Sequence, residues 1–479
     1  SEIRRLGFSA GINVLATIGH HPQYPDKCLH SHYRHMTNKN GEICVGSYCP
    51  SDEDYIDGYV KPLYRIVALA EPEFIWIDDD MRYGHYPIGY GCFCDGCVEK
   101  FNRDYGFSYS RKTLVSSLAD ENNIDLRRKW LHHQSEKIRG VLSAAADTVY
   151  SINNSIKMGL MTGERYFEGF EFESWAQALS QNGRYNIMWR PGGGNYNDLD
   201  SREAVEKQIQ TGRQCAGLPE YVDEICYELE ACPYSPLKKS PVSTANEGIL
   251  SICSGCSGVA WNVMPKRLSD AENIFNAIRS KTPFMELLSE KFKNGKNLGV
   301  YDGWHPQAQA AVPDFFSDYG GRYAEGMDEI DLLGIPRSYN LHKASAFVLQ
   351  GRQPLVFSDE EIRYILSRGV YMDADAADIL CKMGFGKYIG FKKGDETVDD
   401  LSEVCLNHPL NKGIEGESRT CFSVFAKGKS YALIPEKGAA VISNIQDVDR
   451  NVKYPCAMGC FENELGGRVA VCGYFPWTD

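Results

Sequence analysis

The 479-residue chain lacks any run of apolar residues long enough to cross a membrane. A membrane-spanning helix needs about 20 consecutive apolar residues, so we expect a soluble protein without membrane partners. Positive charge is also scarce, because 51 Lys and Arg face 64 Asp and Glu and leave a formal net charge of −13. A surface of that charge repels phosphate backbones, which argues against nucleic-acid partners.

The chain also lacks an initiator methionine and the pattern of a secretory signal peptide. Its first residues, 1–7, read as the end of a helix, and its last residues, 474–479, stop directly after a predicted strand. We therefore expect a longer parent chain, in which case the missing signal says little about export.

Cysteine, in contrast, is abundant, with 17 residues in a spacing unlike that of small disulfide scaffolds. Cys226, Cys253 and Cys381 lie inside apolar patterns and are predicted to be buried thiols. This usage favours a reducing compartment or an anaerobic host, and we expect a cytoplasmic protein.

Short apolar strands alternate with longer amphipathic segments over residues 1–290. The predicted strands are 11–19, 74–80, 157–163, 186–192, 220–230 and 258–263. Such alternation predicts a parallel sheet with crossover helices. The strands turn abruptly polar at their C-terminal ends, where a (β/α)8 barrel carries its active site. We find six strands instead of eight, so we expect a TIM barrel that lacks its first strands.

Two further domains are predicted after the barrel. Residues 291–399 form a second α/β unit of flavodoxin-like type, without a G-x-G-x-x-G motif, a P-loop or a Cys at a strand–helix elbow. We expect a structural or oligomerisation role for it. Residues 400–479 contain short alternating strands with Gly turns, which predicts a small β-rich, sandwich-like domain.

A C-x-C-x-x-C cluster supplies three thiols, those of Cys92, Cys94 and Cys97. A tetrahedral zinc needs a fourth ligand, for which Cys49 and Cys44 are candidates and His85 is a weaker one. Four thiolates form a closed site that joins loops and does no catalysis. The alternative is that these are free thiols of a surface loop.

Paired carboxylates follow two of the predicted strands. Asp78, Asp79 and Asp80 end one strand, and Glu228 and Glu230 end another. Side chains alternate between the two faces of a strand, so Asp78 and Asp80 are expected on one face. Glu228 and Glu230 are likewise expected to share a face, with Glu230 nearer the mouth of the barrel. Adjacent carboxylates repel one another and raise the pKa of at least one, which suits a general acid. The same cluster would also suit a divalent metal.

Polar and aromatic side chains at the other strand ends could bind or orient a substrate. The candidates are His20, His21, Asp78, Arg82, His85, Glu164, Arg165, Arg190, Asn195, Trp261 and Asn262. The Gly192–Gly194 run either lets the backbone approach a ligand or is a plain flexible loop.

Several motifs together resemble the family 42 glycoside hydrolases, the β-galactosidases with a structural zinc. They are Ser47-Tyr48-Cys49-Pro50, an apolar strand with Trp76 that ends in acids, Cys92-Phe93-Cys94-x-x-Cys97 and Phe101–Gly106. The resemblance implies zinc bound by Cys49, Cys92, Cys94 and Cys97. It also implies the domain order barrel, flavodoxin-like (glutamine-amidotransferase-like) trimerisation domain and small β domain, and hence a homo-oligomer.

The resemblance further implies catalytic roles. The family's fourth strand ends in Asn-Glu, which corresponds here to Asp79-Asp80, so Asp80 takes the acid/base role. Glu230, three residues before Pro233, takes the nucleophile role, with Glu228 as the alternative. We therefore predict a retaining, exo-acting glycosidase for β-linked sugars. The alternatives are a non-catalytic carbohydrate-binding relative and a metal-dependent hydrolase that uses the three aspartates and His85.

Overall fold

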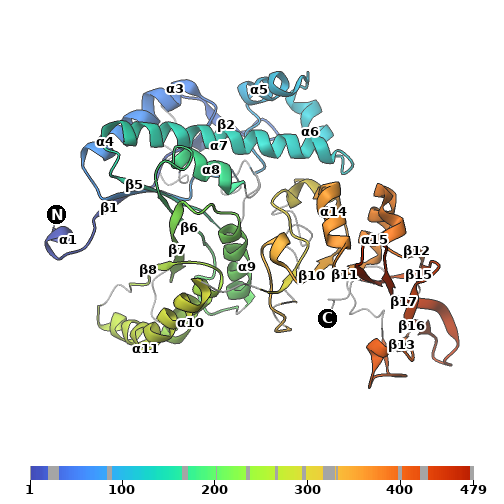
Figure 1. The fold of residues 1–479 in the computed structure, drawn as a ribbon. Coiled ribbons are helices and arrows are strands. Elements are labelled where there is room, and N and C mark those ends of the chain that lie inside the picture. Colours follow the sequence, from blue (N-terminus) through green and yellow to red (C-terminus); the bar gives the residue numbers. More distant parts are fainter. Residues whose placement is uncertain are drawn as a thin grey trace. The chain divides into compact units, whose positions relative to one another are not determined.

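The computed structural model forms two compact units, Ser1–Lys296 with Phe316–Tyr319, and Asn297–Phe315 with Gly320–Asp479 (Figure 1). We call them unit 1 and unit 2. The structure describes residues 2–19, 32–83, 89–163, 171–200, 202–232, 238–264, 268–293, 298–316, 330, 333–397, 402–420 and 430–474. In these ranges, no helix is long and apolar enough to cross a membrane.

A six-stranded sheet is the framework of unit 1. Its strands are β1 (Gly11–Val14), β4 (Phe74–Ile77), β5 (Lys157–Met161), β6 (Ile187–Arg190), β7 (Val222–Glu230) and β8 (Gly258–Asn262). They lie side by side in chain order, and every neighbouring pair is parallel. The six predicted strands are thus confirmed, and a parallel sheet in chain order fits an α/β barrel.

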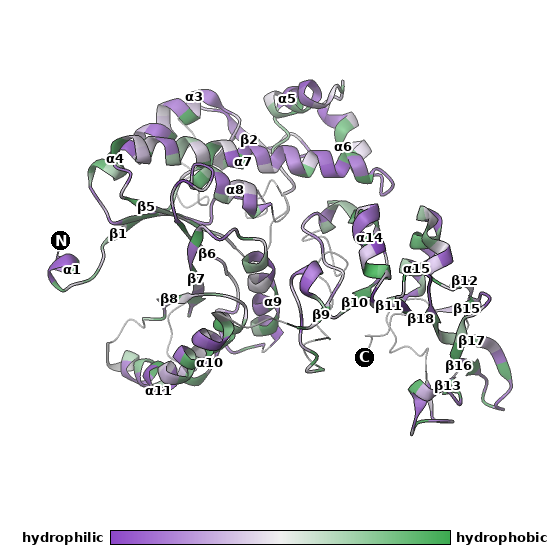
Figure 2. Cartoon of the chain, in the orientation of Figure 1, coloured by the Kyte–Doolittle hydropathy of each residue, from purple (hydrophilic) through white to green (hydrophobic). Residues whose placement is uncertain are grey.

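Helices connect the strands of this sheet. The longer ones are α4 (Lys61–Leu69), α7 (Ile124–Ile152), α8 (Phe172–Leu179), α9 (Arg202–Ala216), α10 (Pro241–Cys253) and α11 (Leu268–Lys293). They carry both hydrophobic and hydrophilic residues (Figure 2), as expected for helices that bury one face. Against β7, for example, Tyr227 and Leu229 pack with Ile274 of α11. Sequence reasoning missed α11.

Shorter elements fill the segments before α7. They are α1 (Glu2–Arg5), the hairpin β2 (His35–Thr37) and β3 (Ile43–Tyr48), α3 (Glu53–Tyr55), α5 (Asp95–Tyr105) and α6 (Arg111–Ala119). Local signals explain two helix ends. Ser110 and Thr113 form a capping box at the start of α6, and α5 ends at Gly106 with φ 70°, a left-handed conformation that favours glycine.

Unit 2 is built on an eight-stranded mixed sheet in the order β14-β13-β16-β17-β18-β11-β10-β9. The strands are β9 (Val300–Tyr301), β10 (Ala346–Leu349), β11 (Gly369–Asp373), β13 (Ser402–Cys405), β14 (Ser418–Thr420), β16 (Ala440–Gln446), β17 (Val452–Glu462) and β18 (Arg468–Cys472). A two-stranded sheet pairs β12 (Phe391–Glu396) with β15 (Tyr431–Pro435), and α14 (Asp359–Leu366) and α15 (Ala374–Leu380) complete the unit.

One strand joins the two halves of this large sheet. β18 pairs in parallel with β11 and antiparallel with β17. Residues of the expected 291–399 and 400–479 domains therefore share a single sheet, and their division into two domains stays a prediction. Residues 317–329 and 421–429 of these domains lie outside the described residues.

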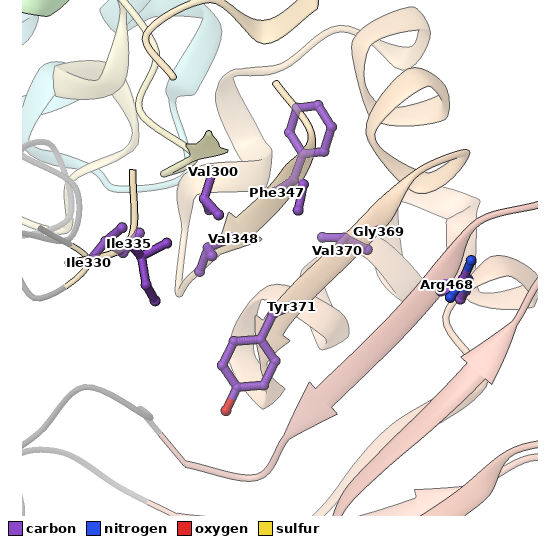
Figure 3. Close-up of a pocket in the computed structure, with 10 residues that line it drawn as sticks. Val300, Ile330, Ile335, Phe347, Val348, Gly369, Val370, Tyr371 and Arg468 are labelled. Carbon is purple, nitrogen blue, oxygen red and sulfur yellow. The ribbon is translucent and has the colours of Figure 1, made fainter. Parts of the chain in front are cut away.

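An apolar hollow of about 350 Å³ lies in unit 2 against β10 and β11 (Figure 3). Phe347, Val348, Val370 and Tyr371 line it, and Arg468 is the charged residue among its lining side chains. Because this lining contains no carboxylate, the hollow does not match the two-carboxylate chemistry that the sequence predicts.

Candidate functional site

The three aspartates after β4 have three different environments. The strand ends at Ile77, so strict alternation does not continue through them. Asp78 accepts a hydrogen bond from Asn13 Nδ2 of β1 at 3.1 Å, whereas Asp79 forms an ion pair with Arg82 at 2.9 Å. The described contacts of these carboxylates therefore diverge instead of converging on one point.

Asp80 is completely buried and is bound to the loop that follows β1. Its Oδ2 accepts hydrogen bonds from the backbone N–H groups of Thr17, Ile18 and Gly19 at 2.7, 2.7 and 3.0 Å. Three N–H donors stabilise the ionised form of a carboxylate. These contacts suit a carboxylate that holds a loop in place, and they suit a proton donor poorly.

Asp79 and Arg82 lie closer to solvent, with side-chain exposures of 19% and 8%. The Arg82 guanidinium packs directly on Gly163, which follows β5. A Cβ atom at Gly163 would lie 1.7 Å from Arg82 Nη1. Because glycine has no side chain, the Arg82 side chain has room to lie across the end of β5.

Glu228 is buried at the end of β7, with 6% of its surface exposed. Its Oε2 lies 3.3 Å from Arg190 Nη2 at the end of β6. Its backbone N–H donates to the Pro191 carbonyl at 3.0 Å, and a Cβ atom at Gly192 would lie 2.6 Å from Glu228 Cβ. Gly192 also has φ 145°, so this position requires glycine in both conformation and space.

Burial raises the pKa of Glu228 to about 7. The positive charges of Arg190 and Lys207 oppose this shift, and the negative charges of Asp79 and Glu230 add to it. Asp79, at the end of β4, and Glu230, at the end of β7, therefore both act on Glu228. Asp79, Glu228 and Glu230, which we call the electrostatic cluster, lie at the ends of β4 and β7 at the C-terminal edge of the sheet.

Glu230 is half-buried and lies beside Asn262 of β8, whose Nδ2 is 3.4 Å from Glu230 Oε1. The register pairs Glu230 with Asn262 and Leu229 with Trp261. Trp261 consequently packs with Leu229 in the layer between β8 and α10, where its ring limits the space at Gly248. Asn262 thus joins the candidate site, and Trp261 lies on the other face of the sheet.

Sequence reasoning missed a buried ionic network behind β7. The Glu247 carboxylate of α10 accepts hydrogen bonds from Lys207 Nζ of α9 at 3.0 Å and from the Tyr227 hydroxyl at 2.9 Å, and it pairs with Lys239. Lys207, Lys239 and Glu247 are 2–3% exposed. No pattern in the sequence distinguishes these charges from solvated ones. The remaining candidates, His20, His21, His85, Glu164 and Arg165, lie outside the described residues.

The four predicted thiols come together and are buried. The Sγ atoms of Cys49, Cys92, Cys94 and Cys97 lie within 4.8 Å of one another. Cys49 Sγ is 3.7 Å from Cys94 Sγ and 3.3 Å from Cys97 Sγ, far beyond the S–S bond length of about 2.05 Å. Four sulfurs at about 2.3 Å from a tetrahedral ion would be about 3.8 Å apart, so the group could bind a metal ion. Cys49, not Cys44, completes it.

Two cations flank these thiols. Lys137 Nζ, from the buried face of α7, lies 3.3 Å from Cys97 Sγ. The Arg34 guanidinium packs on Gly96, where a Cβ atom would lie 1.7 Å from Arg34 Nη1. Hydrogen bonds from the neighbouring thiols, first that of Cys49, together with the charge of Lys137 hold the pKa of Cys97 well below its usual value. The neighbouring thiols raise the pKa of Cys49 and burial raises that of Cys92, whereas the pKa of Cys94 is lowered, so a bound metal would have to displace protons from two of the four ligands.

No protein-family model and no curated protein matches this sequence. Solved structures do match. A β-galactosidase from Rahnella sp. R3 is 12% identical with a TM-score of 0.64 over 100% of this chain and 77% of its own. A GH42 β-galactosidase from G. stearothermophilus is 11% identical with a TM-score of 0.62 over 99% and 76%. An α-L-fucosidase from Paenibacillus thiaminolyticus is 10% identical with a TM-score of 0.57 over 90% and 62%. The resemblance to family 42 is therefore confirmed at the level of the fold.

The raised pKa of Glu228 predicts a pH-dependent stability. In the folded protein this pKa is about 7, against an ordinary value of 4.5, so unfolding releases a proton between these two values. The free energy of unfolding should therefore fall as pH rises through this window. Glu228→Gln removes the titration, so its Tm relative to wild type should rise by roughly a few degrees between pH 5 and pH 8. Thermal unfolding by circular dichroism measures this, and a constant difference would contradict it.

Proposed function

We propose that this protein is a glycoside hydrolase that acts on a β-linked sugar at the C-terminal edge of the unit 1 sheet. The observation that carries the proposal is that the carboxyl groups of Asp79, Glu228 and Glu230 come from the ends of β4 and β7, two strands of one parallel sheet. Glycoside hydrolysis needs two carboxyl groups on either side of the scissile bond. The likeness in fold to β-galactosidases supports the same reaction class.

Asp79 is our choice for the acid/base. Sequence reasoning favoured Asp80, but Asp80 is fully buried and bound to three backbone N–H groups. Asp79 is partly exposed and belongs to the same electrostatic cluster as the two glutamates. A group that must donate a proton to a leaving oxygen needs access to the substrate. Access therefore favours Asp79, although its ion pair with Arg82 also stabilises the ionised form.

Glu230 is our choice for the nucleophile, with Glu228 as the alternative. Glu230 lies nearer the strand end, is half-buried and contacts Asn262, whereas Glu228 is buried against Gly192 and paired with Arg190. In the proposed double displacement, Glu230 attacks the anomeric carbon and Asp79 protonates the leaving oxygen. Water then hydrolyses the glycosyl-enzyme with Asp79 as base, so configuration is retained. Exo action follows from the resemblance alone.

The described contacts do not favour the rival hypotheses. A metal-dependent hydrolase would need the aspartates to converge, yet they contact Asn13, Arg82 and a backbone loop. Among the described residues, the side chains that come close enough together to bind a metal ion are those of the four cysteines. A carbohydrate-binding relative without activity would not need a cluster of interacting carboxyl groups.

We also propose that the four cysteines bind a structural zinc. Four thiolates leave no open coordination position, so such an ion would join the β3 end to the loop before α5 and add folding energy. A divalent ion with four thiolates carries two negative charges, which Lys137 and Arg34 offset. We propose in addition a cytoplasmic location. By resemblance, we also propose a homo-oligomer, namely a trimer.

The proposed reaction predicts hydrolysis of at least one β-glycoside in a panel of nitrophenyl α- and β-glycosides. Glu230→Gln should lower kcat/KM by about three orders of magnitude or more, since it removes the attacking group. Asp79→Asn should do the same for a disaccharide, whose leaving alkoxide needs a proton, and much less for a nitrophenyl glycoside, because nitrophenolate leaves without one. Azide added to Glu230→Ala, which leaves space for the anion, should restore turnover and yield a glycosyl azide of inverted configuration, which identifies the nucleophile. Release of nitrophenol and the stereochemistry of the azide by NMR provide the measurements.

Asp80→Asn is the matched control. It should lower the Tm, because a neutral amide oxygen accepts the N–H groups of residues 17–19 more weakly than a carboxylate oxygen does, and any activity it retains would separate Asp80 from the chemistry. Near-normal activity of Glu230→Gln with loss in Glu228→Gln would transfer the nucleophile to Glu228. A wild-type protein that binds β-glycosides but hydrolyses none would refute the proposed reaction.

The proposed zinc predicts about one metal ion per chain and a specific effect of Lys137. Lys137→Met should weaken zinc binding by about 10–100-fold, because outer hydrogen bonds to a ligand contribute that much to metal affinity. Competition with a chromophoric chelator measures the affinity. Lys129→Met, an exposed position on the same helix, is the control and should bind zinc normally. Equal affinities for both variants would contradict the role of Lys137.

A further inference from the structure

The loop that follows β6 has an unusual backbone. Gly192, Gly193, Gly194 and Asn195 have φ values of 145°, 111°, 75° and 53°, four consecutive residues with positive φ. Asn195 is buried with 8% exposure, and as a non-glycine residue it adopts this conformation at an energetic cost. Backbone of this kind persists only where its surroundings hold it. The glycine run is therefore a constrained segment and not a plain flexible loop.

Lys239, in the loop that follows β7, provides the constraint. Its Nζ donates to the Asn195 carbonyl at 2.6 Å and to the Glu230 carbonyl at 3.3 Å. The same ammonium group pairs with the Glu247 carboxylate. One buried cation thus joins the loop after β6, the end of β7 and helix α10.

Backbone contacts reinforce this junction. The Asp198 N–H donates to the Lys238 carbonyl at 2.8 Å, and the Ser240 N–H donates to the Asp198 carboxylate at 2.7 Å. Ser240 is also the N-cap of α10. The loop after β6 is therefore hydrogen-bonded to Lys238 and Ser240, the two neighbours of Lys239 in the sequence.

The charge of Lys239 can be removed in a test because the network contains a second cation. Glu247 has two buried lysine partners, Lys207 and Lys239, and also accepts the Tyr227 hydroxyl. If Lys239 loses its charge, Glu247 keeps Lys207 and Tyr227, so no buried charge is left without a partner. A neutral residue at position 239 should therefore be compatible with folding.

We propose that Lys239 is a positioning residue that fixes the loop after β6 against the main chain at Glu230, and thereby places Glu228 and Glu230 for reaction. Glu228 depends on this loop because its backbone N–H bonds to Pro191 and its Cβ packs on Gly192. Glu230 depends on Lys239 through its own carbonyl. The inference rests on the proposed glycosidase function for its kinetic part alone.

The test compares Lys239→Met with Lys207→Met. Both remove one cation from Glu247, but Lys239 alone donates to the carbonyls of Asn195 and Glu230. In Lys239→Met, amide hydrogen exchange over residues 192–200 should accelerate by about tenfold or more, and in Lys207→Met it should stay near the wild-type rate. The kcat of Lys239→Met should fall by about 10–100-fold with a smaller change in KM, since misplacement of a reacting group by about 1 Å has effects of that size.

Three results would overturn the proposal. They are unchanged exchange in Lys239→Met, equal acceleration in both variants, or a released loop with an unaltered kcat. Exchange protection of α7 reports whether each variant is folded, and Lys239→Gln replaces Lys239→Met if the latter does not fold. If the wild-type protein hydrolyses no glycoside, the proposed function fails, while the exchange experiment still decides whether Lys239 holds the loop.

Discussion

Buried carboxylates at the C-terminal edge of the unit 1 sheet determine how its loops are arranged, because a carboxylate removed from water needs specific partners. Asp80 accepts hydrogen bonds from three backbone N–H groups of the loop after β1. Glu228 forms an ion pair with Arg190 of β6. Glu247 forms ion pairs with one lysine of α9 and one of the loop after β7. Each partner comes from a different segment. Satisfying these carboxylates therefore fastens neighbouring segments to one another.

The sequence revealed the elements of unit 1 well, because their signals are local. The six strands are apolar runs that end in polar residues, and the C-x-C-x-x-C spacing is readable within six positions. Strand β17 is hard to predict from the sequence for an equally local reason, since Pro455 and Gly459 lie inside it and both residues argue against a strand. In that case the pairing of β17 with β16 and β18 overrides the propensity of its residues.

The candidate site was less predictable, because its properties depend on contacts between distant residues. Asp79 and Asp80 are neighbours in the sequence, and only the loop at residues 17–19 makes one of them buried and bound. Trp261 is an attractive sugar-stacking residue until the β7–β8 register turns it to the face of Leu229. Lys207 and Glu247 lie on helices, where charged residues are mostly solvated, and a single sequence gives no reason to bury them.

Charge links the loop arrangement to the proposed reaction. Around Glu228, Arg190 and Lys207 supply positive charge, and Asp79 and Glu230 supply negative charge. Protonation of Glu228, whose pKa burial raises to about 7, removes one negative charge from this region. A glycosidase passes through a transition state with oxocarbenium character, which an excess of positive charge disfavours. The negative charge of ionised Glu228 thus offsets the positive charge of the lysines that hold the loops near such a reaction.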